Sequence, residues 1–494
     1  MVFNSYTFIV FFGLLLALHS LPLAWKVKKI NLLLASYLFY AVWNPPFIIL
    51  LWLSTVVDYW VALVMSRQEN PGKRKALLLV SLVVNLGMLG FFKYGGFLLE
   101  NFVALLSAVG IAYQPPKADI ILPVGISFYT FQTLSYTLDV YRRKFAPEKS
   151  LLDFSLFVTF FPQLVAGPIV RPGELIPQFK VPHVATREQL VRGLFLLTLG
   201  LFMKVGIADG LLAETADSVF GVPFPLHPLD AWTGVFAFSG QIFCDFAGYS
   251  TCAIGVAMCL VFTLPDNFRY PYAAIGFSDF WRRWHITLST WLRDYLYIPL
   301  GGNRAGKGRV YLNLMITMLL GGLWHGANWN FVIWGGLHGL FLGAERLFRD
   351  RFLRIPKVPA AAASGTIISR ASLVPGLTLS RGTAKFGLAL LTFLLVSITW
   401  VFFRSPDFGT AMRLLLAMFG IIPVRIQLLT TLDLYKVLVV TVTLLGCHWL
   451  MRSTSVEKVA GRTPWWVLGL GWAFMLIVLV LTQKSTGSFI YFQF

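Results

Sequence analysis

The sequence predicts an all-α, polytopic integral membrane protein with roughly ten to twelve transmembrane helices, and further re-entrant or interfacial helices around an internal cavity. Of its 494 residues, 57% are hydrophobic and 13% are charged, and this charged share is about half that of an average soluble domain. Apolar runs recur from one end of the chain to the other, and each span needs ~20 such residues. These observations exclude a soluble globular protein.

The charge distribution indicates a membrane topology and gives no sign of nucleic-acid binding. Lys and Arg number 41 against 22 for Asp and Glu, which gives a formal net charge of +19. The basic residues do not form one continuous face, as a nucleic-acid partner would require. They cluster between apolar runs, as the positive-inside bias of cytoplasmic loops predicts.

The first three apolar runs predict the orientation of the chain. Residues 6–24 form an apolar run that is followed by a basic cluster at residues 26–29, so this cluster is expected in the cytoplasm and the N-terminus outside it. Two further apolar runs are separated by a break at residues 44–46, because proline cannot continue a helix. A second basic cluster at residues 67–75 then returns the chain to the cytoplasmic side.

The pattern becomes irregular after this hairpin. Residues 120–140 are apolar but contain Pro123, Gly125 and Gln132, and Lys93 lies between apolar runs with little room for a loop. Non-helical backbone at membrane depth is tolerated only where it is buried in protein or lines a wet cavity. The sequence therefore predicts segments that enter and return, and a core with an internal cavity.

A single membrane-embedded domain is expected over residues 1–494, with one interruption. Residues 345–385 hold eight basic and two acidic side chains, which predicts a basic, partly disordered linker on the cytoplasmic side. Three further apolar runs follow, at residues 386–402, 435–450 and 465–481.

The first candidate functional segment is residues 278–304, which are too polar to span a membrane and too aromatic for an ordinary loop. One interpretation is an interfacial helix whose tryptophans lie at headgroup depth and whose arginines contact lipid phosphates. The other is a polar floor of a cavity, where arginines bind a phosphate-bearing acyl donor. On a helix, His285 and Ser289 would share one face.

The second candidate segment is residues 321–339, where His325 and His338 lie inside an apolar run rich in glycine. An intramembrane histidine normally faces the protein interior or a wet path, either as a contact between helices or as a functional group. On a continuous helix the two histidines would lie about 220° apart, so His338 is interpreted as structural. No histidine pair has zinc-ligand spacing, so no metal site is expected.

Four motifs carry a resemblance to a known family. They are residues 122–142 (LPVGISFYTFQTLSYTLDVYR), 160–172 (FFPQLVAGPIVRP), 278–304 and 323–326 (LWHG). The sequence resembles the membrane-bound O-acyltransferase family, and within it the bacterial alginate O-acetylation branch. The resemblance implies a tunnel through the membrane, His325 as the intramembrane histidine of the family, and His285 as its second functional histidine.

The activity that the resemblance implies is acyl transfer, most simply of an acetyl group, with His325 as general base. A neutral imidazole can accept a proton from an attacking hydroxyl, an effect typically worth ~10²–10⁴ in rate. His285 is the expected supporting group, and acetyl-CoA or another acyl thioester is the expected donor, with no bound cofactor. Weaker candidates are Asn328, Asp294, Asp245 and Ser289 as supporting residues and Arg282, Arg283 and Arg293 as contacts to donor phosphates.

The implied partners are the lipid bilayer, an exported polysaccharide such as alginate as final acceptor, and an extracytoplasmic acetyltransferase that completes the ester. The implied location is the bacterial inner membrane. Two alternatives stay open at this point. One is D-alanyl transfer to teichoic acid within the same family, and the other is a transporter or channel in which the histidines only relay protons.

Overall fold

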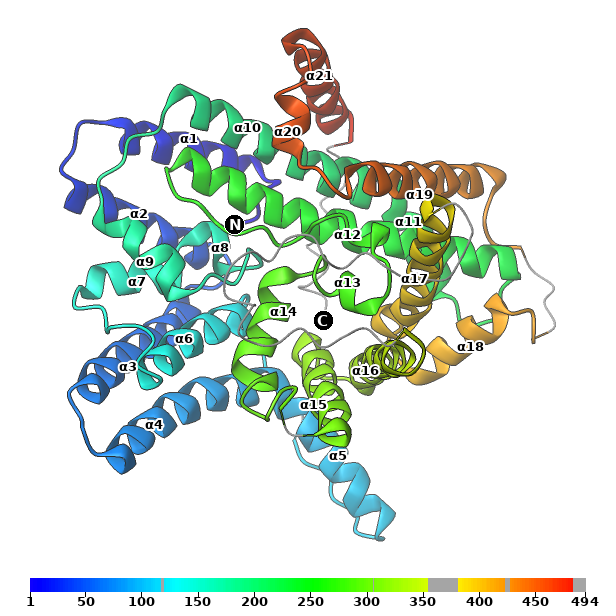
Figure 1. The fold of residues 1–494 in the computed structure, drawn as a ribbon, viewed down its shortest axis with the longest axis horizontal. Coiled ribbons are helices and arrows are strands. Elements are labelled where there is room, and N and C mark those ends of the chain that lie inside the picture. The colour runs from blue at the N-terminus through cyan, green and yellow to red at the C-terminus, as the bar shows by residue number, and fades with distance from the viewer. Residues whose placement is uncertain (117–119, 305, 354–380, 423–426, 483–494) are drawn as a thin grey trace.

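The computed structural model describes residues 1–494 except 117–119, 305, 354–380, 423–426 and 483–494 (Figure 1). All regular secondary structure in these described ranges is helical, which confirms the predicted all-α class. The helices of the N-terminal part are α1 (Tyr6–Ser20), α2 (Trp25–Ala41), η1 (Pro45–Phe47), α3 (Ile48–Ser66), α4 (Pro71–Leu89), η2 (Gly90–Tyr94), α5 (Gly95–Ala108), α6 (Ile126–Tyr141), α7 (Leu151–Thr159), α8 (Phe161–Leu164) and α9 (Pro172–Lys180).

The rest of the chain contains a central group and a C-terminal group. The central helices are α10 (Arg187–Leu201), η3 (Phe202–Ala213), α11 (Glu214–Gly221), α12 (Pro228–Cys259), η4 (Pro271–Ala273), α13 (Phe277–Phe280), α14 (Ile286–Leu292) and η5 (Arg293–Tyr297). The C-terminal helices are α15 (Lys307–His325), α16 (Trp329–Phe348), η6 (Arg349–Leu353), α17 (Arg381–Arg404), α18 (Phe408–Met418), α19 (Thr431–Met451), α20 (Val456–Ala460) and α21 (Trp465–Thr482).

The chain is a multi-pass membrane protein. Among the described residues, seven helical runs are long and apolar enough to cross a bilayer, and two shorter apolar helices accompany them. The sequence predicted roughly ten to twelve spans. The other helices in the described ranges are too short or too polar to be counted as spans by length and composition. The three apolar runs expected after the linker are confirmed as α17, α19 and α21.

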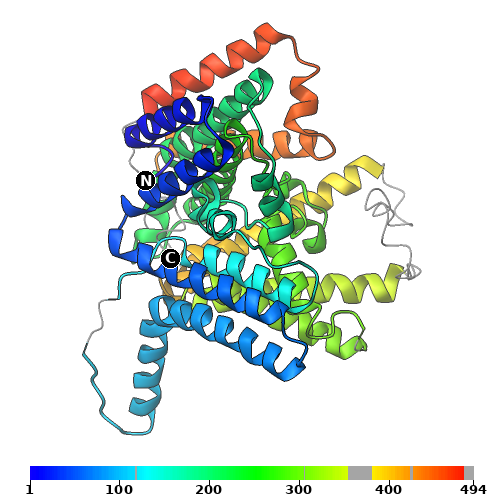
Figure 2. The same ribbon diagram turned by 90° about the vertical axis from the view of Figure 1, so that its left-hand side faces the viewer.

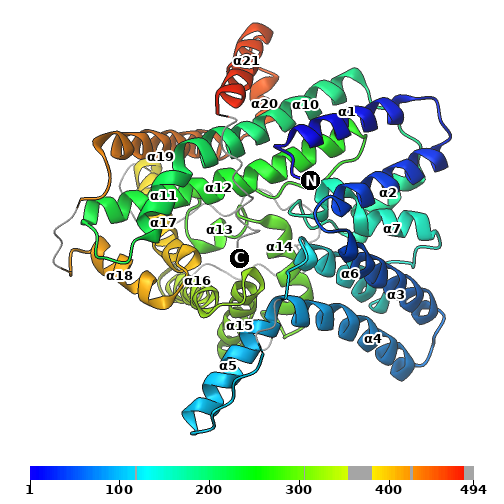
Figure 3. The same ribbon diagram turned by 180° about the vertical axis from the view of Figure 1, so that it is seen from behind.

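The long helix α12 forms the centre of the molecule. It crosses the middle of the view in Figure 1, beside α10 and α11, and Figure 3 shows the same helix from behind. Of its most apolar stretch, 83% is buried inside the protein. Glycines allow α10 to pack closely against it, because a Cβ atom at Gly200 would lie 2.5 Å from the carbonyl oxygen of Gly248.

Two segments singled out in the sequence are more helical than expected. The interval around Lys93 is a π-helical turn inside one continuous helical run from α4 to α5, so no loop is needed there. In Figure 2, α5 extends away from the body of the molecule. The ends of the predicted linker at 345–385 are helical, because α16 and η6 continue to Leu353 and α17 begins at Arg381. Residues 354–380 lie outside the described ranges.

Candidate active site

His325 is the last residue of α15, at the point where the helix ends. Gly326 has φ −163° and ψ 155°, so the chain leaves the helix in an extended conformation, and α16 begins at Trp329. The single continuous run expected across residues 321–339 is therefore wrong. The break at residues 326–328 places His325 at a helix end and His338 in the middle of the next helix.

Closely packed glycines fix the position of α15 against α16. A Cβ atom at Gly322 would collide with the carbonyl oxygen of Phe331, and one at Gly335 would collide with that of Met318. Small residues let helix backbones approach to this extent in membrane proteins. The glycines noted in the sequence thus hold the two helices as a tight hairpin that carries His325 at its turn.

Two side chains from the π-helical turn η2 cap the end of α15. The Tyr94 hydroxyl donates to the Leu323 carbonyl at 2.9 Å, and the Lys93 ammonium donates to the carbonyls of Trp324 at 2.5 Å and His325 at 3.1 Å. The last carbonyls of a helix lack partners within the helix, and a cation is favourable at this end of the helix dipole. Lys93 and Tyr94 therefore hold the backbone that carries His325.

His285 reaches the same region from outside any helix. It directly precedes α14 and has a left-handed backbone conformation, with φ 42°. The expected shared helix face of His285 and Ser289 is wrong, because α14 begins only at Ile286. The Ser289 hydroxyl instead donates to the Trp284 carbonyl at 3.2 Å.

Asn267 holds the segment that follows His285, and sequence reasoning missed this residue. Its carbonyl accepts from the backbone N–H of Ile286 at 2.9 Å, and its side-chain oxygen accepts from the Thr287 hydroxyl at 2.9 Å and the Thr287 N–H at 3.2 Å. Its amide nitrogen donates to the Ser250 hydroxyl at 3.2 Å. A Pro-Asp-Asn segment is typical of a surface turn, whereas Asn267 is buried.

The structure brings the two candidate histidines together in an aromatic environment. Their ring centroids are 6.4 Å apart, and the Trp324 ring lies 5.8 Å from His285 and 5.1 Å from His325. Both histidines are buried. Neither ring nitrogen of His285 has a hydrogen-bond partner within the described part of the chain. Such buried polar atoms are uncommon and call for an explanation, of which a functional role is one.

A small cavity of about 90 Å³ adjoins His325, and we call it the histidine cavity. Part of the first resemblance motif, residues 122–128, forms one wall of it, and the Lys93 ammonium donates to the Ser127 hydroxyl at 3.2 Å in this wall. The lining residues are Trp43, Lys93, Leu122, Pro123, Val124, Gly125, Ile126, Ser127, Phe128, Val165, Trp324 and His325.

The weaker supporting candidates are placed in other contacts. Asp245 forms a buried ion pair with Lys204 of η3, and Asp294 pairs with Arg293 and lies 3.3 Å from Arg171. Asn328 caps α16, accepting from the Asn330 N–H at 2.9 Å, and donates to the Pro406 carbonyl at 3.0 Å. These contacts position helices and loops.

The three arginines expected to contact donor phosphates do not line the histidine cavity. Arg282 is exposed and donates to the Ser278 carbonyl at 3.0 Å. Arg283 lies 3.0 Å from the Asp279 carboxylate, and the exposed Arg293 lies 2.7 Å from Asp294.

Residues 278–304 do not form the single helix that the interfacial interpretation assumed. The segment folds as two short helices and a π-helical turn in the centre of Figure 1. Trp284 and Trp291 are 1% and 7% exposed, so they pack in the protein core and do not face lipid. The Trp291 indole, for example, stacks on Phe131 at 3.8 Å.

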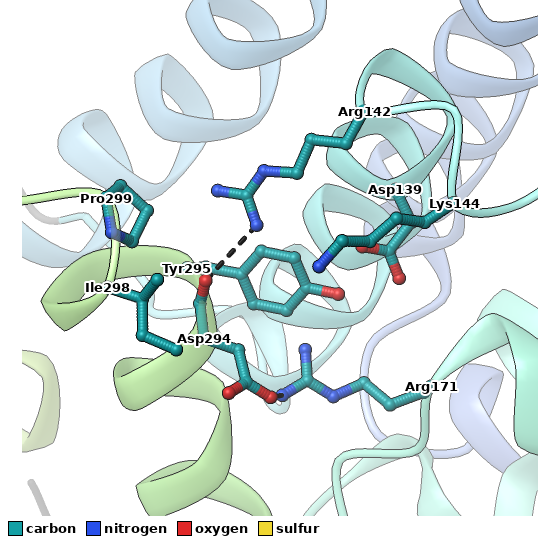
Figure 4. Close-up of a pocket in the computed structure, with 8 residues that line it drawn as sticks. All are labelled: Asp139, Arg142, Lys144, Arg171, Asp294, Tyr295, Ile298 and Pro299. Atoms are coloured by element: carbon teal, nitrogen blue, oxygen red, sulfur yellow. Dashed lines mark hydrogen bonds and ion pairs between the residues drawn. The ribbon is translucent and has the colours of Figure 1, made fainter. Parts of the chain in front are cut away.

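A second, larger cavity of about 470 Å³ lies near the other end of α6 (Figure 4). We call it the basic cavity. Four of its eight lining residues lie in the segment 278–304, which one interpretation of the sequence gave as a cavity floor. Its basic residues Arg142 and Arg171 lie in the first and second resemblance motifs and were not among the expected site residues. Its lining residues are Asp139, Arg142, Lys144, Arg171, Asp294, Tyr295, Ile298 and Pro299.

The fold and the histidine pair define a polytopic membrane protein with a buried imidazole beside an internal cavity, a class that includes membrane acyltransferases. Within the described ranges, no group of three or more His, Cys, Asp and Glu side chains is arranged to hold a metal ion. The model of the membrane-bound O-acyltransferase family matches residues 14–370, and the chain belongs to this family. It is an O-acyltransferase.

Three relatives place the chain within the family. It is 40% identical over 423 residues to a probable alginate O-acetylase of Azotobacter vinelandii, covering 85% of this chain and 78% of that protein. It is 37% identical over 423 residues to a peptidoglycan O-acetyltransferase of Helicobacter pylori, covering 80% and 74%. A teichoic acid D-alanyltransferase of Lacticaseibacillus rhamnosus is 28% identical over 255 residues, covering 47% and 60%.

Proposed function

We propose that the protein transfers an acetyl group from a cytoplasmic thioester such as acetyl-CoA across the bacterial inner membrane, for O-acetylation of an exported polysaccharide. The observation that carries this proposal is the pair of buried histidines beside the histidine cavity. The O-acetylating relatives support an acetyl group and a polysaccharide acceptor. The D-alanyltransferase is less similar, which disfavours D-alanyl transfer.

The proposed reaction uses His325 as a general base. A ring nitrogen of neutral His325 accepts the proton of an acceptor hydroxyl, and the hydroxyl oxygen attacks the thioester carbonyl. The C–S bond then breaks, and the same proton passes to the leaving thiolate, so that ester and thiol are the products. Burial among aromatic rings keeps water from hydrolysing the thioester. The hydroxyl belongs to the polysaccharide or to an extracytoplasmic acetyltransferase that passes the group on.

The capped end of α15 provides the positioning that this chemistry needs. Lys93 and Tyr94 fix the backbone of residues 323–325, so the His325 ring starts from a defined place. Donor and acceptor then need only to reach that ring. Positioning of this kind accounts for a large part of many enzymatic rate enhancements.

The activity test uses membranes that contain the protein and acetyl-CoA labelled in the acetyl group. We expect label to pass to polysaccharide or to a partner protein in a His325-dependent manner. Release of label to water alone, or transfer that survives loss of His325, contradicts the proposal. A parallel incubation with a D-alanyl thioester distinguishes the alternative substrate.

The proposed topology places the N-terminus outside the cytoplasm and the basic loop between α3 and α4 inside it. Cys447 is exposed, so the test starts from Cys447→Ser. On that background, Gln114→Cys, beyond the end of α5, should react with an impermeant thiol reagent in intact cells. Glu69→Cys, in the loop between α3 and α4, should react only after permeabilisation. The reverse pattern contradicts the orientation.

A further inference from the structure

The basic cavity holds three cationic side chains from two separate segments of the chain. Arg142 and Lys144 follow α6, and Arg171 precedes α9. Both guanidinium groups lie over the ring of Tyr295, with Arg171 at 4.4 Å and Arg142 at 5.2 Å from the ring centroid. Figure 4 shows these side chains around one space. Packing on the ring holds the two arginines in fixed orientations.

The contacts of these arginines leave a donor for a ligand. Arg142 Nη1 donates to the Asp294 carbonyl at 3.1 Å, and Arg171 Nη2 donates to the Asp294 carboxylate at 3.3 Å. Arg171 Nη1 is buried and has no hydrogen-bond partner among the residues that the structure describes. Since buried polar atoms are normally satisfied, this nitrogen is suited to an anionic ligand in the cavity.

The charge of the cavity favours an anion that can accept several hydrogen bonds. Its three cations outnumber its two carboxylates, Asp139 and Asp294. Planar guanidinium groups match phosphate oxygens in a bidentate manner, and lysine adds a mobile point charge. Phosphate groups therefore fit this cavity better than a neutral sugar does.

The basic cavity and the histidine cavity lie at opposite ends of α6. Residues 126–128 line the histidine cavity, and Asp139 and Arg142 line the basic cavity. About thirteen residues of helix separate the two sets, which corresponds to roughly 20 Å. A ligand bound at the basic cavity must therefore be long to reach His325.

The basic cavity lies on the side of the molecule that carries basic loops. Arg143, beside it in sequence, lies 3.3 Å from Glu69 in the loop between α3 and α4. Arg74 at the start of α4 donates to the Tyr141 carbonyl at 2.6 Å. The positive-inside bias places these loops in the cytoplasm, which is where a soluble thioester would arrive.

A series of aromatic rings connects the two sites. Tyr295 contacts Trp291 at 5.1 Å, Trp291 stacks on Phe131 at 3.8 Å, and Phe131 lies 5.5 Å from Trp324. Trp324 then contacts His325 at 5.1 Å. These rings form the protein interior between the basic cavity and the imidazole.

We propose that the basic cavity binds the phosphate groups of the thioester donor through Arg142, Lys144 and Arg171, while the acyl end extends along the ring series to His325. The inference rests on the proposed function, because it takes a phosphate-bearing thioester as the donor. It replaces Arg282, Arg283 and Arg293 as the expected phosphate contacts with residues that line a cavity.

The test measures binding of coenzyme A to purified protein in discs of neutral phosphatidylcholine. Arg142→Gln combined with Lys144→Gln should raise the Kd by about tenfold to a hundredfold, as expected for the loss of charge-assisted contacts. The matched control is Arg143→Gln with Lys149→Gln. It also removes one arginine and one lysine from this segment, but neither residue lines the cavity, so the Kd should be unchanged. An unchanged Kd in the cavity variant overturns the proposal.

Two further measurements keep the outcome clear. Lys144→Gln alone alters an exposed side chain, so it tests the cavity if the double variant fails to fold, and an unchanged Kd there also counts against the proposal. Discs with added phosphatidylglycerol identify a competing source of phosphate. If this lipid is retained by the wild type, lost from the cavity variant, and coenzyme A binding is unaffected, the cavity binds a lipid headgroup and the proposal is wrong.

Failure of this inference is distinguishable from failure of the proposed function. His325→Ala should bind coenzyme A with the wild-type Kd and transfer acetyl groups about 10²- to 10⁴-fold more slowly. If the wild type transfers acetyl groups and the cavity variant binds normally, only the donor site is wrong. If the cavity variant loses coenzyme A binding and the wild type itself transfers no acetyl group, the proposed donor site is supported and the proposed transfer reaction is wrong.

Discussion

The surroundings of His325 and His338 differ although both imidazoles are buried and contact the same tryptophan. The Trp334 ring lies 5.1 Å from His325 and 4.7 Å from His338. His325 stands at a helix end and lines a cavity. His338 is in the middle of α16, and its Nε2 lies 3.1 Å from the Thr399 hydroxyl. Burial alone therefore does not distinguish a histidine that lines a cavity from one that joins two helices.

A hydroxyl of α17 holds the His338 ring. The Thr399 hydroxyl lies within hydrogen-bond distance of both His338 Nε2, at 3.1 Å, and the Val396 carbonyl, at 2.7 Å. This ring nitrogen is therefore engaged in a contact between two helices. The bond ties α16 to α17, as expected for a contact between membrane helices.

The largest expected effect is the difference in acetyl-transfer rate between variants of His325 and His338. His325→Ala should lower acetyl transfer per folded molecule by about 10²- to 10⁴-fold, because it removes the general base, while membrane insertion and polymer export continue. His338→Ala should retain most of the transfer rate and lower the thermal unfolding midpoint. Transfer rates normalised to folded protein check both variants. Equal loss of activity in the two variants would show that the distinction is wrong.

The second effect concerns the cap of α15. Lys93→Met removes the ammonium that holds the Trp324 and His325 carbonyls, and we expect kcat to fall by about tenfold to a hundredfold through misplacement of the imidazole. Tyr94→Phe removes one hydrogen bond, worth about 0.5–1.5 kcal/mol, and should have a smaller effect. Steady-state kinetics on purified protein measure both.

The control for the cap is Lys436→Met, which makes the same substitution in α19 at a lysine paired with Asp433. It should leave kcat unchanged. If Lys93→Met lowers the yield of folded protein but leaves kcat of the remainder unchanged, the lysine stabilises the fold without positioning His325.

The third effect tests how His285 is held. Asn267→Ala removes the side-chain hydrogen bonds to Thr287 and Ser250 but leaves the backbone bond to Ile286. We expect a loss of about 1–3 kcal/mol in stability, because buried partners become unsatisfied, together with a lower kcat. Conservative Asn267→Asp should restore the acceptor for Thr287 and part of the activity. Full activity in Asn267→Ala would contradict a positioning role.

Sequence reasoning predicted the fold class and the C-terminal spans, and it named His325 and His285 as candidate site residues, but it predicted only part of the site. Hydrophobicity and run length determine membrane helices, so these were accessible from the sequence. The histidine pairing came from resemblance, because His285 and His325 are 40 residues apart in the chain. The sequence showed Lys93 as a charged residue between apolar runs. Its contact with the end of α15 could not be predicted, because it joins a π-helical turn to a helix end far away in the sequence.

The failures have a common physical reason. Helical periodicity was applied to residues 278–304, where the chain leaves the helix at His285 with a positive φ. Tryptophan and arginine together suggested an interface, yet Trp284 packs 5.0 Å from Trp400 in the core. Composition reports which residues are present, whereas a binding site depends on which of them face one cavity.

The smallest expected effect separates the two groups of arginines. Arg282 is exposed and contacts the carbonyl of Ser278, one turn before it, so Arg282→Gln should change stability by no more than about 0.5 kcal/mol and leave the KM for acetyl-CoA unchanged. Arg171→Gln should raise that KM with kcat retained at saturating donor, because it weakens binding in the ground state and the transition state alike. Steady-state kinetics on the two purified variants compare their KM values for acetyl-CoA, and each variant has lost one positive charge. A raised KM in Arg282→Gln together with a normal KM in Arg171→Gln would move the donor site to the surface around Arg282, since the charge that matters would then lie outside the basic cavity.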